Sequence, residues 1–377
     1  MNNMHPYDKL TFLFICLLVS GITEVWAQQI NFLVGSTNKE AIESVAICRL
    51  NEQSKTIELV GKLKAGTRPG YIAVNDDNLY AVSTLEQADQ QHTLRSFKLL
   101  PTEKTLEPLN NVSSLGLNPC HIAIARDGSS MLTANYSSGS IAQYALDPNG
   151  SIGGNLYFEQ FSGGSIHPSR QQAPHAHYIN CTIDNQYVLT ADLGTDKVMI
   201  HRMDQGKMRT NAEQPYLELP AGSGPRHLEF HPNNQWIYVL NELNSTISLI
   251  EYQNQTFTLK HTISTLPPEF KETSYAAAVR IHPSGQIIYS SNRGSDSISV
   301  YAIDDSGQLS RIQTFGEGLG WVRDFNVSPS GKFMVAGNEK TDRIVLLELN
   351  QDGTIGSFLS SLEFPNPSCF IFDTFSE

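Results

Sequence analysis

The chain has 377 residues, of which 40% are hydrophobic and 17% are charged, and it contains no low-complexity tract. This length is ample for a globular protein with a substantial core. Its formal net charge of −12 argues against nucleic acid and anionic membranes as partners, because both are bound through basic patches.

The first 27 residues are typical of a secretory signal peptide. The segment LTFLFICLLVSG has about the length of a signal-peptide apolar region, and EVWA before Gln28 supplies small residues at the cleavage positions. A buried or anchoring N-terminal helix is the alternative. No second apolar stretch is long enough to span a bilayer. We therefore expect residues 1–27 to be removed and the mature protein to be exported, periplasmic or secreted, with no membrane attachment.

A pattern of about fifty residues repeats along the rest of the chain. Three copies match almost position by position: EFHPNNQWIYVLNELNSTISLIEYQ (229–253), RIHPSGQIIYSSNRGSDSISVYAID (280–304) and NVSPSGKFMVAGNEKTDRIVLLELN (326–350). Weaker copies and fragments extend the series to the front of the chain. The residue that ends the second strand of each copy gives seven markers: Ser36, Thr84, Asn135, Asp192, Asn241, Asn292 and Asn338.

Each copy predicts four short antiparallel strands, because runs of alternating apolar residues are separated by Pro, Asp, Asn and Gly turns. Such units bury their faces only by packing radially, so we expect an all-β, seven-bladed β-propeller. The first copy lacks an inner strand, and NPSCFIF (366–372) resembles the inner strand NPCHIAI (118–124). The C-terminal strand should therefore complete the first blade. Opening such a ring would expose two blade faces, so residues 28–377 should form a single domain.

The repeat also separates structural residues from candidates for chemistry. His231 and His282 occupy the repeated turn between the first two strands, each followed by a proline, so we assign both to turn structure. Asn241 and Asn292 are repeated markers, and we assign them to structure as well.

Two positions of the repeat differ in chemistry between copies. Fifteen residues before the marker stand Cys120, His177, Arg226, Ala277 and Arg323. One residue after the marker stand Tyr136, Leu193, Glu242, Arg293 and Glu339. Both positions lie at the same edge of a strand hairpin, and radial packing gathers that edge around one mouth of the propeller. The polar side chains expected to converge there, with His175 nearby, are His177, Arg226, His227, Glu242, Arg293, Arg323 and Glu339. A solvated ion-pair network with a satisfied histidine pair is the structural alternative.

Five segments in order, PHAHY, GPRHLEFHP, YVLNELNST, YSSNRGSDSISVY and VRDFNVSPSGKFMVAGNE, resemble the signature stretches of the seven-bladed lactonase family. The similarity runs from about residue 30 to residue 372. This family includes propeller-type 6-phosphogluconolactonases and a carboxy-muconate lactonizing enzyme. The resemblance implies the opening or making of a lactone ring, with no redox cofactor and no obligatory metal. It places the family's polar set on His175, His177, Arg226, His227, Glu242 and Arg293. One motif departs from the pattern, since Val322 replaces the usual proline before Arg323.

These residue types suit lactone hydrolysis, which needs an activated water and a donor for the charge on the carbonyl oxygen. Glu242 or His177 is expected as the base and Arg226 as the partner of the oxyanion. Arg293 and Arg323 can anchor an anionic group such as phosphate. The expected catalytic residues are Glu242, His177, Arg226 and His175, and the expected substrate-binding residues are His227, Arg293, Arg323 and Glu339.

Several alternatives remain open at this point. His175, His177 and His227, together with Glu242, can also ligate zinc, although the arginines would repel a cation. The chain can instead be a muconate-type lactonizing cycloisomerase, or a non-catalytic propeller that binds a ligand or protein. An exported lactonase would act on an unphosphorylated or unrelated lactone if 6-phosphogluconolactone stays in the cytoplasm. One disulfide is possible among Cys48, Cys120, Cys181 and Cys369, with no pairing indicated.

Overall fold

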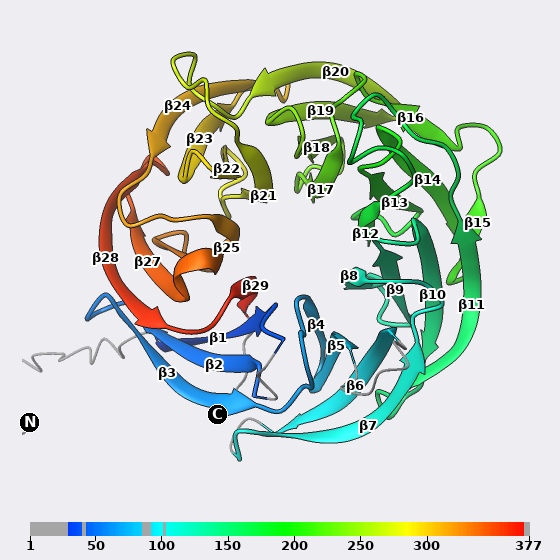
Figure 1. Ribbon diagram of the computed structural model, residues 1–377, viewed down its shortest axis with the longest axis horizontal. Helices are drawn as coiled ribbons and strands as arrows, with labels where there is room; N and C mark the ends of the chain where they lie inside the picture. The colour runs from blue at the N-terminus through cyan, green and yellow to red at the C-terminus, as the bar shows by residue number, and fades with distance from the viewer. Residues whose placement is uncertain (1–28, 40–42, 85–91, 101–102, 373–377) are drawn as a thin grey trace, which may run out of the picture.

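The computed structural model describes residues 29–39, 43–84, 92–100 and 103–372. The expected signal peptide, residues 1–27, lies outside the described residues. Strands form seven antiparallel sheets that surround a central axis like the blades of a propeller (Figure 1). Within the described ranges the helical structure is a single 3-10 turn, η1 (Glu339–Thr341). The described part of the chain therefore contains no helix of the length and apolar character needed to cross a membrane.

Each blade runs from an inner strand at the axis to an outer strand at the rim. Blade 1 contains β29 (Pro367–Phe372), β1 (Gln29–Ser36), β2 (Val45–Asn51) and β3 (Thr56–Leu63). Blade 2 contains β4 (Ile72–Asn75), β5 (Asn78–Thr84), β6 (His92–Leu100) and β7 (Thr105–Ser113). Blade 3 contains β8 (Pro119–Ile124), β9 (Ser130–Asn135), β10 (Ser140–Leu146) and β11 (Ile152–Gln160).

The remaining four blades follow in chain order. Blade 4 contains β12 (Ala176–Cys181), β13 (Tyr187–Asp192), β14 (Lys197–Asp204), β15 (Lys207–Thr210) and β16 (Tyr216–Glu218). Blade 5 contains β17 (Pro225–Phe230), β18 (Trp236–Asn241), β19 (Thr246–Gln253) and β20 (Thr256–Ser264). Blade 6 contains β21 (Tyr275–Ile281), β22 (Ile287–Arg293), β23 (Ser297–Ile303) and β24 (Leu309–Phe315). Blade 7 contains β25 (Val322–Val327), β26 (Phe333–Asn338), β27 (Arg343–Leu349) and β28 (Ile355–Glu363).

The predicted ring closure is confirmed. β29 pairs antiparallel with β1, with Phe32 opposite Phe372 and Val34 opposite Phe370, so the last strand is the inner strand of the first blade. The two ends of the described chain thus share one sheet (Figure 1). Six of the seven predicted markers are the last residues of their strands, and β22 continues one residue past Asn292.

Apolar side chains hold neighbouring blades together. The second strands are buried on both faces, as in β9, β13 and β26, whereas the outer strands alternate buried and exposed positions. Seven hydrophobic clusters result, one at each contact between adjacent blades. The cluster between blades 6 and 7, for example, packs Tyr289 against Phe325 with ring centroids 6.5 Å apart. Burial between sheets therefore stabilises the ring at every interface.

The repeated turn histidines connect adjacent blades, which confirms their structural assignment. His231 Nε2 lies 2.8 Å from the carbonyl oxygen of Gly285, and His282 Nε2 lies 2.9 Å from that of Gly331. In both cases the histidine of one turn bonds to the equivalent turn of the next blade. The marker Asn241 is also structural, because its amide donates to the hydroxyl groups of Thr246 and Ser248.

Two details differ from the simplest expectation. Blade 4 has a divided outer strand, because β15 and β16 each pair with a different part of β14. The possible disulfide is absent, since all four cysteines within the described residues are free thiols.

Candidate functional site

A β-bulge opens the inner strand of five blades at the position fifteen residues before the marker. The pairing register with the second strand skips Cys120, His177, Arg226, Ala277–Ala278 and Arg323–Asp324 in blades 3 to 7. A bulged residue leaves the regular alternation of the strand, so its side chain can be directed away from the blade interface. The bulge therefore explains why this position differs in chemistry between blades.

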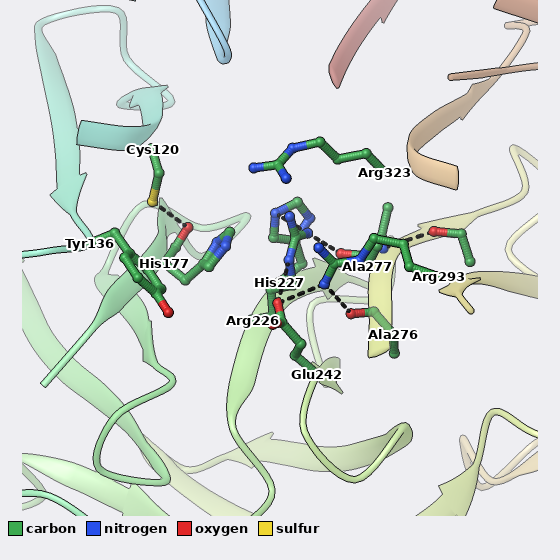
Figure 2. A network of polar contacts seen from close by, with 12 residues as sticks. Cys120, Tyr136, His177, Arg226, His227, Glu242, Ala276, Ala277, Arg293 and Arg323 are labelled. Carbon is green, nitrogen blue, oxygen red and sulfur yellow. Dashed lines mark hydrogen bonds and ion pairs between the residues drawn. The ribbon is translucent and has the colours of Figure 1, made fainter. Parts of the chain in front are cut away.

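Glu242 lies within reach of three arginines. Its Oε2 atom lies 2.8 Å from Arg293 Nη2 and 3.0 Å from Arg226 Nε (Figure 2). Its Oε1 atom lies 2.7 Å from Nη2 of Arg170. Glu242 and Arg226 are only 4% and 2% exposed, so these ion pairs are formed largely out of water. We refer to Glu242, Arg170, Arg226 and Arg293 as the arginine–glutamate cluster.

The charges of this cluster control its protonation. Burial alone would raise the pKa of Glu242, but the charges of Arg293 and Arg226 outweigh it and hold that pKa well below its usual range. Burial and the charge of Arg293 lower the pKa of Arg226 to about 9, which still leaves the guanidinium protonated at neutral pH. Burial opposes the charge of Arg170, yet the neighbouring Glu242 carboxylate raises the Arg170 pKa above its ordinary value. Glu242, Arg226 and Arg170 are therefore ionised at neutral pH, and positive charge exceeds negative charge in the cluster.

Arg226 is held by two further contacts. Its Nη1 atom donates to the carbonyl oxygen of Ala277 and lies 2.9 Å from Nε2 of His227 (Figure 2). A guanidinium only donates hydrogen bonds, so His227 Nε2 must accept and the ring is neutral with its proton on Nδ1. Burial, with the charge of Arg226, also lowers the pKa of His227 well below its ordinary value. The contact makes His227 a support for Arg226.

His177 faces the cluster from blade 4 (Figure 2). The side chain is 7% exposed, and its Nδ1 atom has no hydrogen-bond partner in the described part of the chain. Burial and the charge of Arg226 lower the pKa of His177 well below its ordinary value, so the imidazole is neutral at neutral pH. His177 packs edge-on against Tyr136 and His227, with ring centroids 5.5 Å away in each case.

His175 occupies a different environment from His177. Its ring stacks on Tyr136 with centroids 4.6 Å apart, and its Nδ1 atom lies 2.9 Å from the Tyr136 carbonyl oxygen. Its backbone N–H donates to Asp192. The two histidines therefore do not form a core pair with each other.

Arg323 and Glu339 form a second, separate ion pair. Arg323 Nη1 lies 3.5 Å from Glu339 Oε2, and the hydroxyl of Thr37 donates to Glu339 Oε1 at 3.0 Å. Arg323 extends over His227 on the side away from Glu242 (Figure 2). The residues expected at the mouth thus divide into the arginine–glutamate cluster with its histidines and this pair.

A tight turn that requires glycine fixes the segment that carries Arg226. Gly224 has a φ of +64°, and a Cβ atom there would overlap the side chain of Leu243. The Gly224 carbonyl accepts from the Glu242 N–H at 2.7 Å, which ties the two ends of the β17–β18 hairpin together. Arg226 and Glu242 therefore leave one hairpin at the same edge.

The repeat did not reveal Arg170. It lies in the long connection between β11 and β12, outside the aligned copies, and donates to both Glu242 and the Tyr136 hydroxyl. The spacing of the markers held a signal, because the interval from Asn135 to Asp192 is the longest of the series. The additional residues in that interval include the segment that supplies Arg170.

The cluster offers little to a metal ion. Across residues 29–39, 43–84, 92–100 and 103–372, no group of three or more His, Cys, Asp or Glu side chains is arranged to hold one. Glu242 is occupied by arginines and the Nε2 atom of His227 accepts from Arg226, so the residues of the alternative zinc site are not free to share one ion.

Comparison with known proteins decides the family. The model of the family described as "Lactonase, 7-bladed beta-propeller" matches residues 31–372. The chain belongs to the seven-bladed lactonase family. A 6-phosphogluconolactonase of Bacillus subtilis (strain 168) is 30% identical over 346 residues, which is 90% of this chain and 97% of that protein.

Solved structures of similar proteins share the fold of this lactonase-family chain. The periplasmic gluconolactonase PpgL of Pseudomonas aeruginosa superposes with a TM-score of 0.85 at 26% identity, covering 92% of this chain and 99% of that one. A protein from Lactobacillus plantarum does so with a TM-score of 0.85 at 28% identity, covering 92% and 99%. In this lactonase propeller the polar residues of the family motifs lie at a single mouth.

Proposed function

We propose that this chain is an exported sugar-lactone hydrolase of the 6-phosphogluconolactonase type, acting at the mouth formed by the arginine–glutamate cluster. The observation that carries the proposal is the combination of Glu242, held by three arginines, with the neutral imidazole of His177 beside it, whose Nδ1 atom has no hydrogen-bond partner among the described residues. Membership of the lactonase family and the similarity to a 6-phosphogluconolactonase support the reaction class.

His177 is the better candidate for the base. A base must be unprotonated and free to accept a proton, and the low pKa of His177 keeps its ring neutral. Glu242 is also unprotonated, but its three ion pairs already occupy both carboxylate oxygens, which leaves neither free to take a proton from water. We assign Glu242 to hold Arg226 and Arg293 in place, and His227 to orient Arg226.

The reaction then proceeds in two steps. A water attacks the lactone carbonyl carbon while His177 takes one of its protons, and the negative charge that forms on the carbonyl oxygen is stabilised by Arg226 and Arg293. The ring C–O bond then breaks, and the leaving alkoxide takes the proton back from the imidazolium. The product is the open-chain aldonic acid, which releases a proton at neutral pH.

A buried donor atom supports a ligand at this place. The buried Nε atom of Arg293 has no hydrogen-bond acceptor among the described residues. Buried polar atoms without partners are uncommon in folded proteins, and a substrate carbonyl or carboxylate oxygen can satisfy them. His175, stacked on Tyr136, is assigned to shape the wall of the mouth.

Export rests on the N-terminal segment and on a structural relative. Residues 1–27 have the pattern of a signal peptide, and the related gluconolactonase of Pseudomonas aeruginosa is described as periplasmic. N-terminal sequencing of the protein recovered from the periplasm or medium should begin at Gln28. Recovery of the full-length chain from the cytoplasm would contradict export.

The function is tested by recording acid release in a pH-stat with gluconolactone and with its 6-phosphate. The protein should accelerate release from at least one lactone, and Arg226→Met should lower that rate by about 100-fold or more, the scale found for loss of an oxyanion donor. Release no faster than the uncatalysed rate from both lactones would overturn the proposal. Loss of muconate absorbance in a parallel assay would instead indicate the cycloisomerase.

A further inference from the structure

A cavity lies beside the arginine–glutamate cluster. Its volume is about 60 Å³, and its walls include Thr37, Arg68, His92, Cys120 and Arg323. These residues come from the mouth ends of blades 1, 2, 3 and 7. A single water needs about 10–15 Å³ of cavity volume, so the cavity has room for a small polar group.

The cavity carries excess positive charge. Its lining contains two arginines and no aspartate or glutamate. The nearest carboxylate, Glu339, lies 3.5 Å from Arg323 and accepts from Thr37. In contrast, the guanidinium of Arg68 makes no ion pair or hydrogen bond with any described residue. Glu339 pairs directly with Arg323 and acts on Arg68 without an ion-pair contact, so a single carboxylate faces two guanidinium groups.

Two further observations agree with an anionic occupant. Burial and then the charge of Arg323 lower the pKa of Arg68, and Glu339 only partly opposes this shift, as expected for two guanidinium groups that share one carboxylate across the cavity. His92, at the start of β6, has a buried Nδ1 atom with no partner in the described part of the chain. An oxyanion between these groups would relieve the repulsion and supply an acceptor.

The cavity adjoins the proposed reaction site. Cys120 and Arg323 line it, and in the view of the cluster Cys120 lies beside His177 and Arg323 lies beside His227 (Figure 2). The cluster, the cavity lining and the adjoining Glu339 together contain five arginines and two glutamates, in a chain whose net charge is −12. Positive charge is thus concentrated at this mouth, where it attracts an anionic ligand.

We infer that Arg68 and Arg323 form an anion subsite that selects lactones bearing a phosphate or carboxylate away from the ring carbonyl. The inference rests on the proposed lactone hydrolysis for the identity of the ligand. In this arrangement Arg226 and Arg293 bind the carbonyl oxygen of the lactone. Arg68 and Arg323 bind the phosphate or carboxylate at the other end of the substrate. Arg68 is a specificity-determining residue, absent from the family motifs noted above.

Equilibrium binding tests the subsite without requiring turnover. Calorimetry measures the binding of three ligands that differ at the end distant from the shared carboxylate. In 6-phosphogluconate that end carries a phosphate, in glucarate it carries a second carboxylate, and in gluconate it carries neither. The wild-type protein should bind one or both of the first two at least about tenfold more tightly than gluconate, and Arg68→Met should remove that preference. Arg68→Lys should keep part of it, because the charge remains. Whichever ligand loses its advantage in Arg68→Met identifies the oxyanion.

The ratio of kcat/KM for gluconolactone 6-phosphate to that for gluconolactone provides the kinetic counterpart. This ratio should fall about tenfold or more in Arg68→Met and stay at the wild-type value in the control Arg209→Met, whose arginine is exposed and paired with Asp204. An unchanged ligand preference in Arg68→Met, in a protein with a wild-type unfolding midpoint, would overturn the subsite. If no lactone is hydrolysed but the binding preference depends on Arg68, the proposed function fails and the subsite stands.

Discussion

Replacing Glu242 by glutamine should destabilise the folded protein strongly, because it removes one charge from a cluster of four. Glutamine keeps the size of the side chain and one acceptor oxygen, so the main loss is electrostatic. Arg226 and Arg293, 2% and 8% exposed, would then face each other without a counterion. Breaking a buried ion pair by removing one partner costs about 3–5 kcal/mol. The pair with Arg170, whose side chain is 31% exposed, adds at most about 1 kcal/mol.

Urea unfolding of Glu242→Gln beside a matched control measures this cost. Glu363→Gln breaks the exposed pair with Arg343 at 3.7 Å and should cost less than about 1 kcal/mol. The double variant Glu242→Gln/Arg293→Met removes one of the two stranded charges and should recover about 1–3 kcal/mol relative to the sum of the single variants. A loss below about 1 kcal/mol in Glu242→Gln, or strict additivity in the double variant, would refute the assignment of Glu242 as the counterion that holds the arginines.

Three other predictions follow from the same geometry. Gly224→Ala should destabilise the protein by about 1–3 kcal/mol, because the position has a positive φ and the added methyl group would overlap Leu243. The control Gly154→Ala should be close to neutral, because no atom lies near its added methyl group, and equal unfolding midpoints of the two variants would contradict this prediction. Arg170→Met should lower kcat/KM less than Arg226→Met does, because the Arg170 side chain is partly exposed and pairs with Glu242 from the solvent side. If pH-stat rates showed the larger loss for Arg170→Met, Arg170 would lie closer to the reacting atoms. The free energy of unfolding should fall as the pH drops below 6.5, by up to about 1.4 kcal/mol per pH unit for each of His121, His177 and His227, because burial keeps these histidines neutral in the fold while the unfolded chain protonates them. A further loss should begin near pH 4.5, where Glu242 takes up a proton in the unfolded chain but not in the folded one. Thermal midpoints that are flat between pH 7 and pH 5 would show that these histidines are protonated in the fold.

The blades were predictable from sequence because the repeat is an internal alignment. A marker such as Asn241 recurs at the end of each second strand, and the strand order then follows from radial packing. The closing strand could be recognised because Cys369 stands in a segment that matches the inner strand around Cys120. The divided outer strand of blade 4 could not, since outer strands face solvent and follow weak patterns.

The mouth was predictable only in part. Aligned positions identified Arg226 and Glu242, but alternation of apolar residues cannot show a bulge of one residue, so the direction of the Arg226 side chain was not available. Arg170 and Arg68 lie in connections outside the repeat, where no register exists. The choice between His177 and Glu242 as base also required structure, because it depends on the three arginines around the carboxylate.

Two histidines at opposite ends of the blades provide the most direct test of the central claim that lactone is hydrolysed at this mouth. His177 is the second residue of the inner strand of blade 4, whereas His231 lies in the turn that follows the inner strand of blade 5 and bonds to Gly285. The measurement is kcat/KM for the better lactone substrate in His177→Gln and in His231→Gln. We predict a loss of about 100-fold or more for His177→Gln and a change of about twofold or less for His231→Gln. Equal effects of the two substitutions, with both proteins folded, would contradict the account.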